Sequence, residues 1–358
     1  MTDYRPMLLA RAGEMTALKE TSASTWIGLT PVLIVPPREW NYESEDYGKT
    51  LEEHYSGLPS RFTSALGANE AFVDLSLLDS DAPIFGGIHP LVWLVEACAA
   101  DGTFLTPLVT AASTPAFVAA TKYLHDTYDI GTGIKLTPAE WLTVDPAPMA
   151  TLVTALGIGD SRIDLFVDCA STFGPLVHRS LMAELEHQER GRSFRSTTVG
   201  AAGFPDTAGL AKGVSEFDRD DWMLYLQVAA ARNPLQFELP GFFDNVVQNP
   251  DSVEVGVNPR FMSISAMLRY TTDDQWLIAK GDLFKGPAGR SKGGAALIPA
   301  LKVLVAHPKY GTPISSKLDT WVAEVLATTS APGGPQQWRM WATIRHLDVV
   351  VTQLSSVV

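Results

Sequence analysis

The stretches 132-TGIKLT and 162-RIDLFVD decide how this sequence folds. Each is a short apolar run of strand length, and a helix-like stretch separates them, as expected of parallel strands joined by helices. The helical signal is plain in 114-TPAFVAATKYLHDTYD and in 215-SEFDRDDWMLYLQVAAA, which starts with Ser and acidic residues. Further runs repeat the pattern at 5-RPMLLA, 31-PVLIVPP, 70-EAFVDLSLL, 106-TPLVTAA, 193-SFRSTTVG and 235-LQFELPG. This alternation predicts an α/β fold, a TIM-like (β/α)8 barrel.

The sequence after the last of these runs departs from the βα rhythm. The segment 264-ISAMLRYTTDDQWLIAKG has two β-prone runs around Thr-Thr-Asp-Asp, which predicts a β-hairpin. The final segment, 337-QWRMWATIRHLDVVVTQL, has apolar residues every three or four positions and is interpreted as the eighth barrel helix. We therefore expect residues 1–358 to form a single TIM-barrel-like domain. Within it, 255–335 would form a β-hairpin insertion and extra helices in the last βα unit, before the last helix.

Composition favours a large buried core and disfavours a nucleic-acid-binding surface. Hydrophobic residues make up 46% of the chain and charged residues 19%. The formal net charge is −13, whereas affinity for nucleic acids comes mainly from clusters of Lys and Arg. Positive charge concentrates in 280-KGDLFKGPAGRSKGG, but the glycines of this stretch indicate a solvated loop. We expect no direct nucleic-acid binding.

The cysteines and the apolar runs predict a cytoplasmic protein. Cys98 and Cys169 lie in apolar surroundings, which favours buried free thiols and a reducing compartment. Two cysteines do not provide a zinc-binding spacing. The start of the chain, MTDYRPMLLARAGE, lacks the long apolar core of a signal peptide, and the sequence contains no apolar run of about 18 residues that would span a membrane.

Polar residues at predicted strand ends are the main candidates for chemistry, because common catalytic motifs are absent. The sequence has no G-x-x-x-x-G-K-[ST], H-E-x-x-H or G-x-S-x-G motif. Lys135 lies inside an apolar strand and Asp168 closes the next one, so adjacent barrel strands would bring them close enough to pair. Three interpretations stay open: a structural ion pair, an anchor for a substrate or anion, and an amine of lowered pKa that forms a Schiff base.

Several carboxylates also fall in or just after predicted strands, at Glu14, Asp74, Asp168 and Asp244. At one barrel mouth they could act as acid and base or bind a divalent metal, although such residues often only cap the following helix. Since no histidine accompanies them, we expect neither a metal site nor a cofactor. Lys135, Asp168, Asp74 and Glu14 are the candidate catalytic residues.

Positive charge gathers near the predicted eighth unit, at Arg269, Arg339 and His346. In TIM barrels the loops after the last two strands often bind phosphate. These three residues and Asp244 are the candidate ligand-binding residues. The alternative is that the aromatic helix face carrying His346 is packed core.

Four stretches resemble the beta protein family, and the resemblance covers nearly the whole chain. They are 4-YRPMLLARAGEMTAL, 29-LTPVLIVPP, 269-RYTTDDQWLIAKG and 338-WRMWATIRHLDVVVTQL. The last two are the most specific, because each combines several residue types that barrel periodicity does not demand. The chain departs from the family pattern at Val35, where Glu is expected, at Arg345-His346, where two histidines are expected, and at Leu318-Asp319, where Gly-Asp is expected. A catalytic role for a Glu in the second strand or for a His pair is therefore not carried over.

The resemblance implies an anti-phage defence or toxin-control setting, because the family is named for the beta protein of a satellite-phage operon. The first hypothesis from the resemblance is a regulatory or sensing protein that binds a nuclease-like effector partner from the same locus, or a phage component. The acidic charge would suit a basic partner. The second hypothesis is a barrel hydrolase or phosphodiesterase acting on a small anionic or phosphorylated ligand. In that case Lys135, Arg269 and Arg339 would bind the anion.

Overall fold

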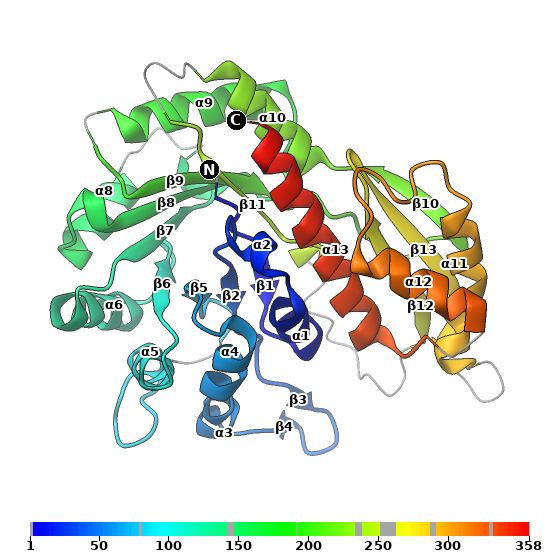
Figure 1. Ribbon diagram of the computed structural model, residues 1–358. Helices are drawn as coiled ribbons and strands as arrows, with labels where there is room; N and C mark the ends of the chain where they lie inside the picture. Colours follow the sequence, from blue (N-terminus) through cyan, green and yellow to red (C-terminus); the bar gives the residue numbers. More distant parts are fainter. Residues whose placement is uncertain are drawn as a thin grey trace. The chain divides into compact units, whose positions relative to one another are not determined.

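The computed structural model describes residues 3–78, 81–141, 147–190, 192–232, 238–250, 263–286, 291–328 and 332–357. Figure 1 labels the helices and strands. The chain divides into two compact units. Unit 1 consists of Met1–Arg11, Gly28–Ala202 and Met223–Asp244, and unit 2 of Ala12–Ile27, Gly203–Trp222 and Asn245–Val358.

Unit 1 is built on an eight-stranded sheet with the order β1-β2-β5-β6-β7-β8-β9-β11, in which neighbouring strands run parallel (Figure 1). Tyr4, just before β1, forms a parallel bridge with Phe242 of β11. The amide of Arg5 donates to the carbonyl oxygen of Phe242 at 2.8 Å. The first and last strands are thus joined, and the sheet is a nearly closed, barrel-like one. Its strands are β1 Met7–Leu9, β2 Val32–Ile34, β5 Ala71–Asp74, β6 Leu105–Val109, β7 Thr132–Leu136, β8 Ile163–Asp168, β9 Ser196–Ala201 and β11 Gly241–Asp244.

The first seven strands of this sheet lie where the apolar runs predicted them, but the position predicted for the eighth was wrong. Of the run 235-LQFELPG, residues 235–237 lie outside the described residues and 238–240 are not in a strand. The strand is instead Gly241–Asp244, whose sequence is GFFD. Proline has no amide hydrogen to donate to a central ladder. Pro240 therefore precedes the strand and does not lie within it.

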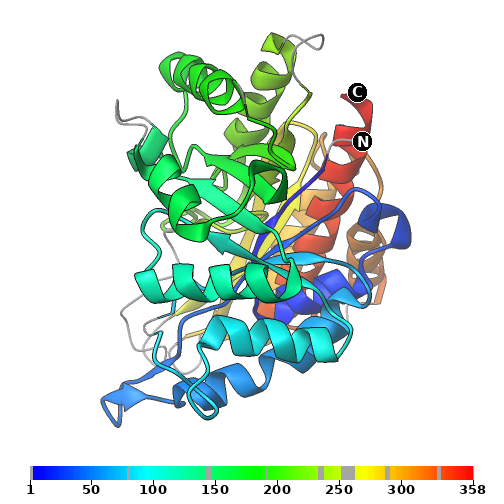
Figure 2. The ribbon, with the colours of Figure 1, turned by 90° about the vertical axis from the view of Figure 1, so that its left-hand side faces the viewer.

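Helices of unit 1 follow the strands and cover the outside of the sheet. Pro stands at the start of several of them, and Thr114 caps α6 by accepting a hydrogen bond from the amide of Phe117 at 3.1 Å. Helix α5 packs between α4 and α6, and Figure 2 shows the three side by side. The bounds are α3 Leu51–Ser56, α4 Leu58–Leu66, α5 Pro90–Ala100, α6 Pro115–Tyr128, α7 Pro138–Trp141, α8 Ala147–Leu156 and α9 Pro175–Glu189, with a small two-stranded sheet of β3 Trp40–Asn41 and β4 Asp46–Tyr47.

Side chains fill the interior of the barrel-like sheet. One apolar residue from each of six strands meets there: Met7, Val32, Phe72, Leu108, Phe166 and Phe243. Gly133 of β7 completes this layer, because a Cβ at that position would lie only 2.6 Å from Cδ1 of Leu108. The interior is therefore packed core, and any ligand has to bind at an end of the sheet.

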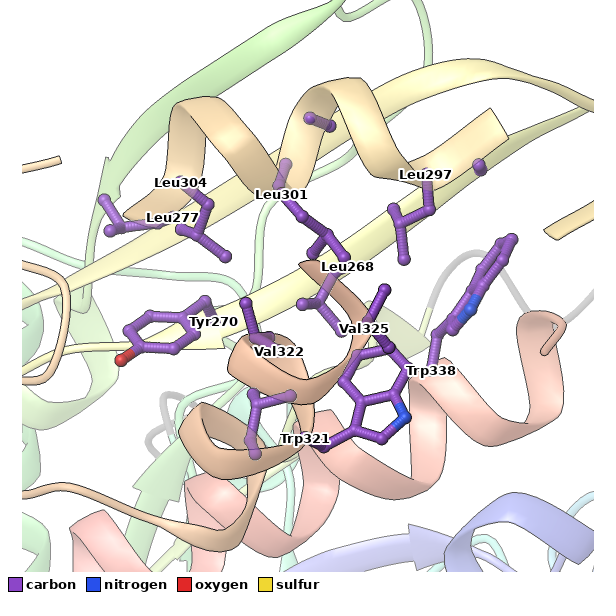
Figure 3. Packing of buried hydrophobic residues seen from close by; sticks show 14 of the residues in the cluster. Leu268, Tyr270, Leu277, Leu297, Leu301, Leu304, Trp321, Val322, Val325 and Trp338 are labelled. Carbon is purple, nitrogen blue, oxygen red and sulfur yellow. The ribbon is translucent and has the colours of Figure 1, made fainter. Parts of the chain in front are cut away.

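Unit 2 contains a three-stranded antiparallel sheet with the order β10-β13-β12. The segment for which a β-hairpin was predicted supplies β12 and β13, which pair antiparallel. Apolar residues of this sheet pack against α11, α12 and α13, as Figure 3 shows for Leu268, Leu301 and Val322. The bounds are β10 Gly213–Asp218, β12 Ile264–Thr271, β13 Gln275–Lys285, α1 Ala12–Glu20, α2 Ala23–Trp26, α11 Ile298–Val305, α12 Lys317–Thr328 and α13 Pro335–Ser356. Within the described ranges, no helix has both the length and the apolar character needed to cross a membrane.

Two local predictions for this part of the chain were wrong. The helix predicted from Ser215 begins later, as α10 Asp220–Ala231, because 213–218 pair with β13 as strand β10. The stretch predicted as a solvated loop from Lys280 instead continues β13 to Lys285, and its residues 287–290 lie outside the described residues. Gly281 allows a close approach, since a Cβ there would lie 2.0 Å from the carbonyl oxygen of Ala296.

Candidate functional site

Polar side chains of unit 1 gather at the carboxyl end of its sheet. Phe72 and Phe166 belong to the interior layer. Because side chains alternate between the two faces of a strand, Asp74 lies on the same face as Phe72, at the last position of β5. Asp168 has the same relation to Phe166 on β8, and Lys135 lies near the end of β7. The sequence thus places three charged residues at the mouth of the sheet.

Lys135 forms an ion pair with Asp74. Its Nζ lies 3.6 Å from Oδ2 of Asp74, and the two side chains are 15% and 4% exposed. The other oxygen, Oδ1 of Asp74, accepts a hydrogen bond from the amide of Ser76 at 2.8 Å. Burial lowers the pKa of Lys135, but Asp74, Asp168 and Glu140 together raise it above its usual value. The ammonium is therefore charged at neutral pH, which favours an anchoring or structural role over Schiff-base chemistry.

Asp168 lies in an environment that favours its protonated form. Burial raises its pKa, and the opposing charge of Lys135 compensates only in part. Its Oδ1 accepts a hydrogen bond from the amide of Ala170 at 2.7 Å. Ala170 has a φ of 47°, in the left-handed region that residues other than glycine rarely adopt. A carboxyl group with a raised pKa at a strand end keeps its proton to a higher pH than a solvated one and can donate or accept it.

A cavity of about 310 Å³ lies beside this charged group. Its wall is formed by the carboxyl ends of β5 and β6 and by the loops that follow them, a common place for binding sites in parallel α/β folds. The hydroxyl of Thr114 donates to Asp81, and Oγ of Ser113 accepts from the amide of Thr110 at 3.0 Å. The polar residues that line the cavity are Asp74, Ser76, Asp81, Thr110, Ser113 and Thr114.

Sequence reasoning missed Glu140 and Asp81. The two carboxylate oxygens of Glu140 accept hydrogen bonds from the amides of Ala111 and Thr137, at 3.0 and 2.6 Å. Its position four residues after the end of β7 could have pointed to the mouth of the sheet. Asp81 comes from a loop rich in turn residues, where periodicity gives no signal.

The predicted site residues Glu14, Arg339 and Arg269 lie in unit 2. Nη1 of Arg339, on α13, donates to Oε1 of Glu14, on α1, and to Oε1 of Gln248, at 2.9 Å in each case. The guanidinium carbon of Arg269, on β12, lies 5.4 Å from the centre of the Phe204 ring. These residues form a cluster of their own within unit 2.

The structure places Asp244 and His346 in packed surroundings. Asp244 follows Phe243 of the interior layer and therefore lies on the opposite face of β11, where Oδ1 accepts a hydrogen bond from the hydroxyl of Tyr4 at 2.7 Å. His346 is fully buried and stacks on Trp276, with ring centres 4.9 Å apart. Of the four candidate carboxylates, Asp74 and Asp168 lie beside Lys135, Asp244 lies on the opposite face of β11, and Glu14 belongs to unit 2.

Two further groups of residues bear on possible chemistry. Cys98 and Cys169 are free and buried, as predicted, and burial raises the pKa of each thiol to about 12. They are therefore poor nucleophiles. In the part of the chain that the structure describes, no three or more His, Cys, Asp or Glu residues are arranged to hold a metal ion.

The fold and the cavity define a mixed α/β protein with a nearly closed parallel sheet and a polar site at the carboxyl ends of its strands. The family model described as Beta protein matches residues 4–352, so the chain belongs to this family. Comparison with the curated proteins finds no match.

The departures from the family pattern occupy structural positions. Val35 is fully buried at the end of β2. Arg345 is also fully buried, and its Nη1 lies 2.9 Å from Oδ2 of Asp319 while Nε donates to the carbonyl oxygen of Thr271 at 2.7 Å. Arg345 and Asp319 therefore form an internal ion pair of unit 2.

Proposed function

We propose that this chain is a regulatory or sensing protein of a bacterial anti-phage defence or toxin-control module, in which it binds an effector partner. A small polar ligand in the cavity beside Asp74 would change that binding. The observation that carries the proposal is this cavity, about 310 Å³ in volume, in which one wall residue is ion-paired with Lys135. The volume suits a small molecule, and a few fixed polar groups are enough to orient one.

The geometry around Lys135 supports ligand sensing. Asp74 contributes to the cavity wall and also contacts the ammonium of Lys135, so a ligand that competes for its carboxylate changes the balance of charge at the mouth. The charge balance at the mouth also affects Asp168, because the charge of Lys135 opposes the rise that burial causes in the pKa of Asp168. Ligand binding would thereby reach the loops after β7 and β8, where we place the partner's contacts.

The proposed partner is a basic, nuclease-like protein from the same locus, and a phage component is a further candidate. A net charge of −13 supports a basic partner, because complementary potentials speed encounter. We place both proteins in the cytoplasm. In this proposal the chain is a single TIM-like (β/α)8 domain, with 255–335 as the β-hairpin and helical insertion and α13 as the eighth barrel helix.

An enzymatic function is the second candidate. The raised pKa of Asp168 beside a charged lysine supports it, because a hydrolase needs a group that donates and accepts protons. The enzyme would be a hydrolase or phosphodiesterase acting on a small anionic or phosphorylated ligand.

Co-expression with the product of the neighbouring gene tests the regulatory function. We expect the two proteins to co-purify at low salt and to separate as salt rises, because the attraction is electrostatic. Asp74→Asn should weaken the control of the neighbour's toxicity. The matched control is Asp126→Asn, since Asp126 makes only an exposed pair with Lys122. If the chain purifies alone at every salt concentration and its deletion leaves toxicity unchanged, the regulatory function is wrong. Hydrolysis of a phosphodiester that is lost in Asp168→Asn would establish the enzymatic function in its place.

A further inference from the structure

Arg269 is a half-buried cation whose charge no carboxylate of the described residues balances. Its Nε is buried and has no hydrogen-bond partner among the described residues. The ring of Phe204 lies against it, with its centre 5.4 Å from the guanidinium carbon. Buried charges in proteins are almost always paired, because removing a charge from water is costly. A guanidinium also stays protonated at neutral pH, so it cannot escape this cost by losing its proton. An anion from outside the chain would balance it.

The surroundings of Arg269 carry an excess of positive charge. Burial, followed by the charge of Arg339, lowers the pKa of Arg269, and the opposing effect of Glu14 is smaller. Glu14 is itself bonded to Arg339 through Oε1 at 2.9 Å. Among the described residues, the two guanidinium groups therefore have one carboxylate near them, which leaves one positive charge. The side chain of Arg339 is 24% exposed, so the cluster is open to solvent on its side.

We propose that Arg269 and Arg339 form a binding site for a phosphate group. Guanidinium groups donate parallel hydrogen bonds whose geometry matches the oxygens of phosphate. Gln248 accepts a hydrogen bond from Arg339 through Oε1, which leaves its amide nitrogen as a further donor. Phe204 and Gln248 come from the chain segments that follow β9 and β11, the last two strands of the eight-stranded sheet. The corresponding loops of TIM barrels often bind phosphate.

This site is a second one, in unit 2, and does not depend on the function proposed for the cavity in unit 1. Glu14 is a positioning residue, because its bond to Arg339 fixes the direction of that guanidinium. Arg269, whose fork is not bonded to a carboxylate among the described residues, would make the stronger contact with phosphate.

Binding and thermal unfolding of the full chain test the site, with inorganic phosphate, ribose 5-phosphate and ribose as probes at constant ionic strength. We expect both phosphate compounds to bind and to raise the melting temperature, and ribose to do neither. Tighter binding of inorganic phosphate would identify the ligand as free phosphate. Tighter binding of ribose 5-phosphate would identify it as a phosphorylated small molecule.

The variant Arg269→Met separates a binding role from a structural one. It should weaken phosphate binding at least about tenfold, because it removes a bidentate donor. Without phosphate, its melting temperature should not fall, because the substitution removes an unbalanced charge that is partly withdrawn from water. Arg162→Gln is the control, since Arg162 pairs with Asp129 in unit 1, and it should bind phosphate as the wild type does.

Two outcomes would overturn the proposal. The first is that phosphate and chloride at equal ionic strength give the same melting temperature and no binding is measured. The second is that Arg269→Met binds phosphate with wild-type affinity. Arg269→Lys keeps the charge without the planar fork, so an intermediate affinity for this variant would support recognition by geometry as well as by charge.

Discussion

The two ends of the eight-stranded sheet of unit 1 each carry a buried cation, but they use it differently. At the amino end, the guanidinium of Arg5 lies over the rings of Phe72 and Phe166, 5.1 and 5.3 Å from their centres. It donates to Oγ1 of Thr198 at 2.9 Å and lies 3.5 Å from Asp164. At the carboxyl end, Lys135 pairs with Asp74 beside a cavity.

Asp164 makes the amino end a closed network. Besides Arg5, it accepts hydrogen bonds from the hydroxyl of Ser196 at 2.5 Å and from Nε of Arg195 at 3.0 Å. The cation and its carboxylate are bonded to neighbours on several strands, so they hold these strands together. At the carboxyl end Asp74 also borders open volume, and Asp168 has a raised pKa. The contrast indicates that the amino end stabilises the fold and the carboxyl end is available to a ligand.

The largest effect should come from Asp164→Asn, at the amino end. The substitution leaves Arg5 buried, and its remaining carboxylate partner among the described residues is Asp3, 3.5 Å away and exposed to solvent. We expect a loss of about 3 kcal/mol or more in the free energy of unfolding, as is typical when one member of a buried pair is removed. Urea-induced unfolding measures it. Asp126→Asn is the matched control and should cost less than about 0.5 kcal/mol, because its pair is exposed. Equal losses for the two variants would show that the amino end has no special role in stability.

A smaller and pH-dependent loss is expected from Lys135→Met. Without the ammonium, the carboxylates of Asp74 and Asp168 lose the cation between them, and the pKa of Asp168, already raised by burial, rises further. A carboxyl group with a raised folded-state pKa destabilises the protein above that pKa, and the penalty disappears as the pH falls through it. The loss should be on the order of 2 kcal/mol at pH 8 and clearly smaller at pH 5.

Unfolding of Lys122→Met provides the comparison for this pH dependence, because Lys122 pairs with an exposed carboxylate. Its effect should be small and similar at both pH values. If the loss in Lys135→Met were the same at pH 5 and pH 8, the carboxylates at the mouth would not be coupled to Lys135.

Much of the barrel-like sheet could be predicted from the sequence, because each strand is a local signal. A short apolar run between turn residues indicates a buried strand without knowledge of its neighbours. The eighth strand was misplaced because Leu235 and Phe237 continue the apolar pattern up to Pro240, and only the ladder itself shows that pairing starts after the proline. The start of α10 was misplaced because Ser215 resembles an N-cap, and pairing with β13 overrides this preference.

The candidate site could be predicted only in part. Adjacency of β7 and β8 suggested that Lys135 and Asp168 are near each other, and the effect of each on the other's pKa agrees. The direct partner is instead Asp74, two strands away, because curvature of a nearly closed sheet brings interior side chains of non-adjacent strands together. The pair of Arg339 and Glu14 is separated by 325 residues, and no local pattern indicates it.

The smallest effect on stability is expected from Asp168→Asn. This substitution tests whether the carboxyl end of the sheet, unlike the amino end, does not act as a stabilising network. Because its folded-state pKa is raised above the usual 3.8, the carboxylate of Asp168 destabilises the protein at pH 8, and this cost disappears as the pH falls through that pKa. The amide oxygen of asparagine can still accept the bond from Ala170. We therefore expect the variant to be as stable as the wild type at pH 8, or up to about 1 kcal/mol more stable, with the difference shrinking towards pH 4. A clear loss of stability at pH 8 would mean that Lys135 holds Asp168 in a structural pair, as Arg5 holds Asp164, and the mouth would then be a second stabilising network.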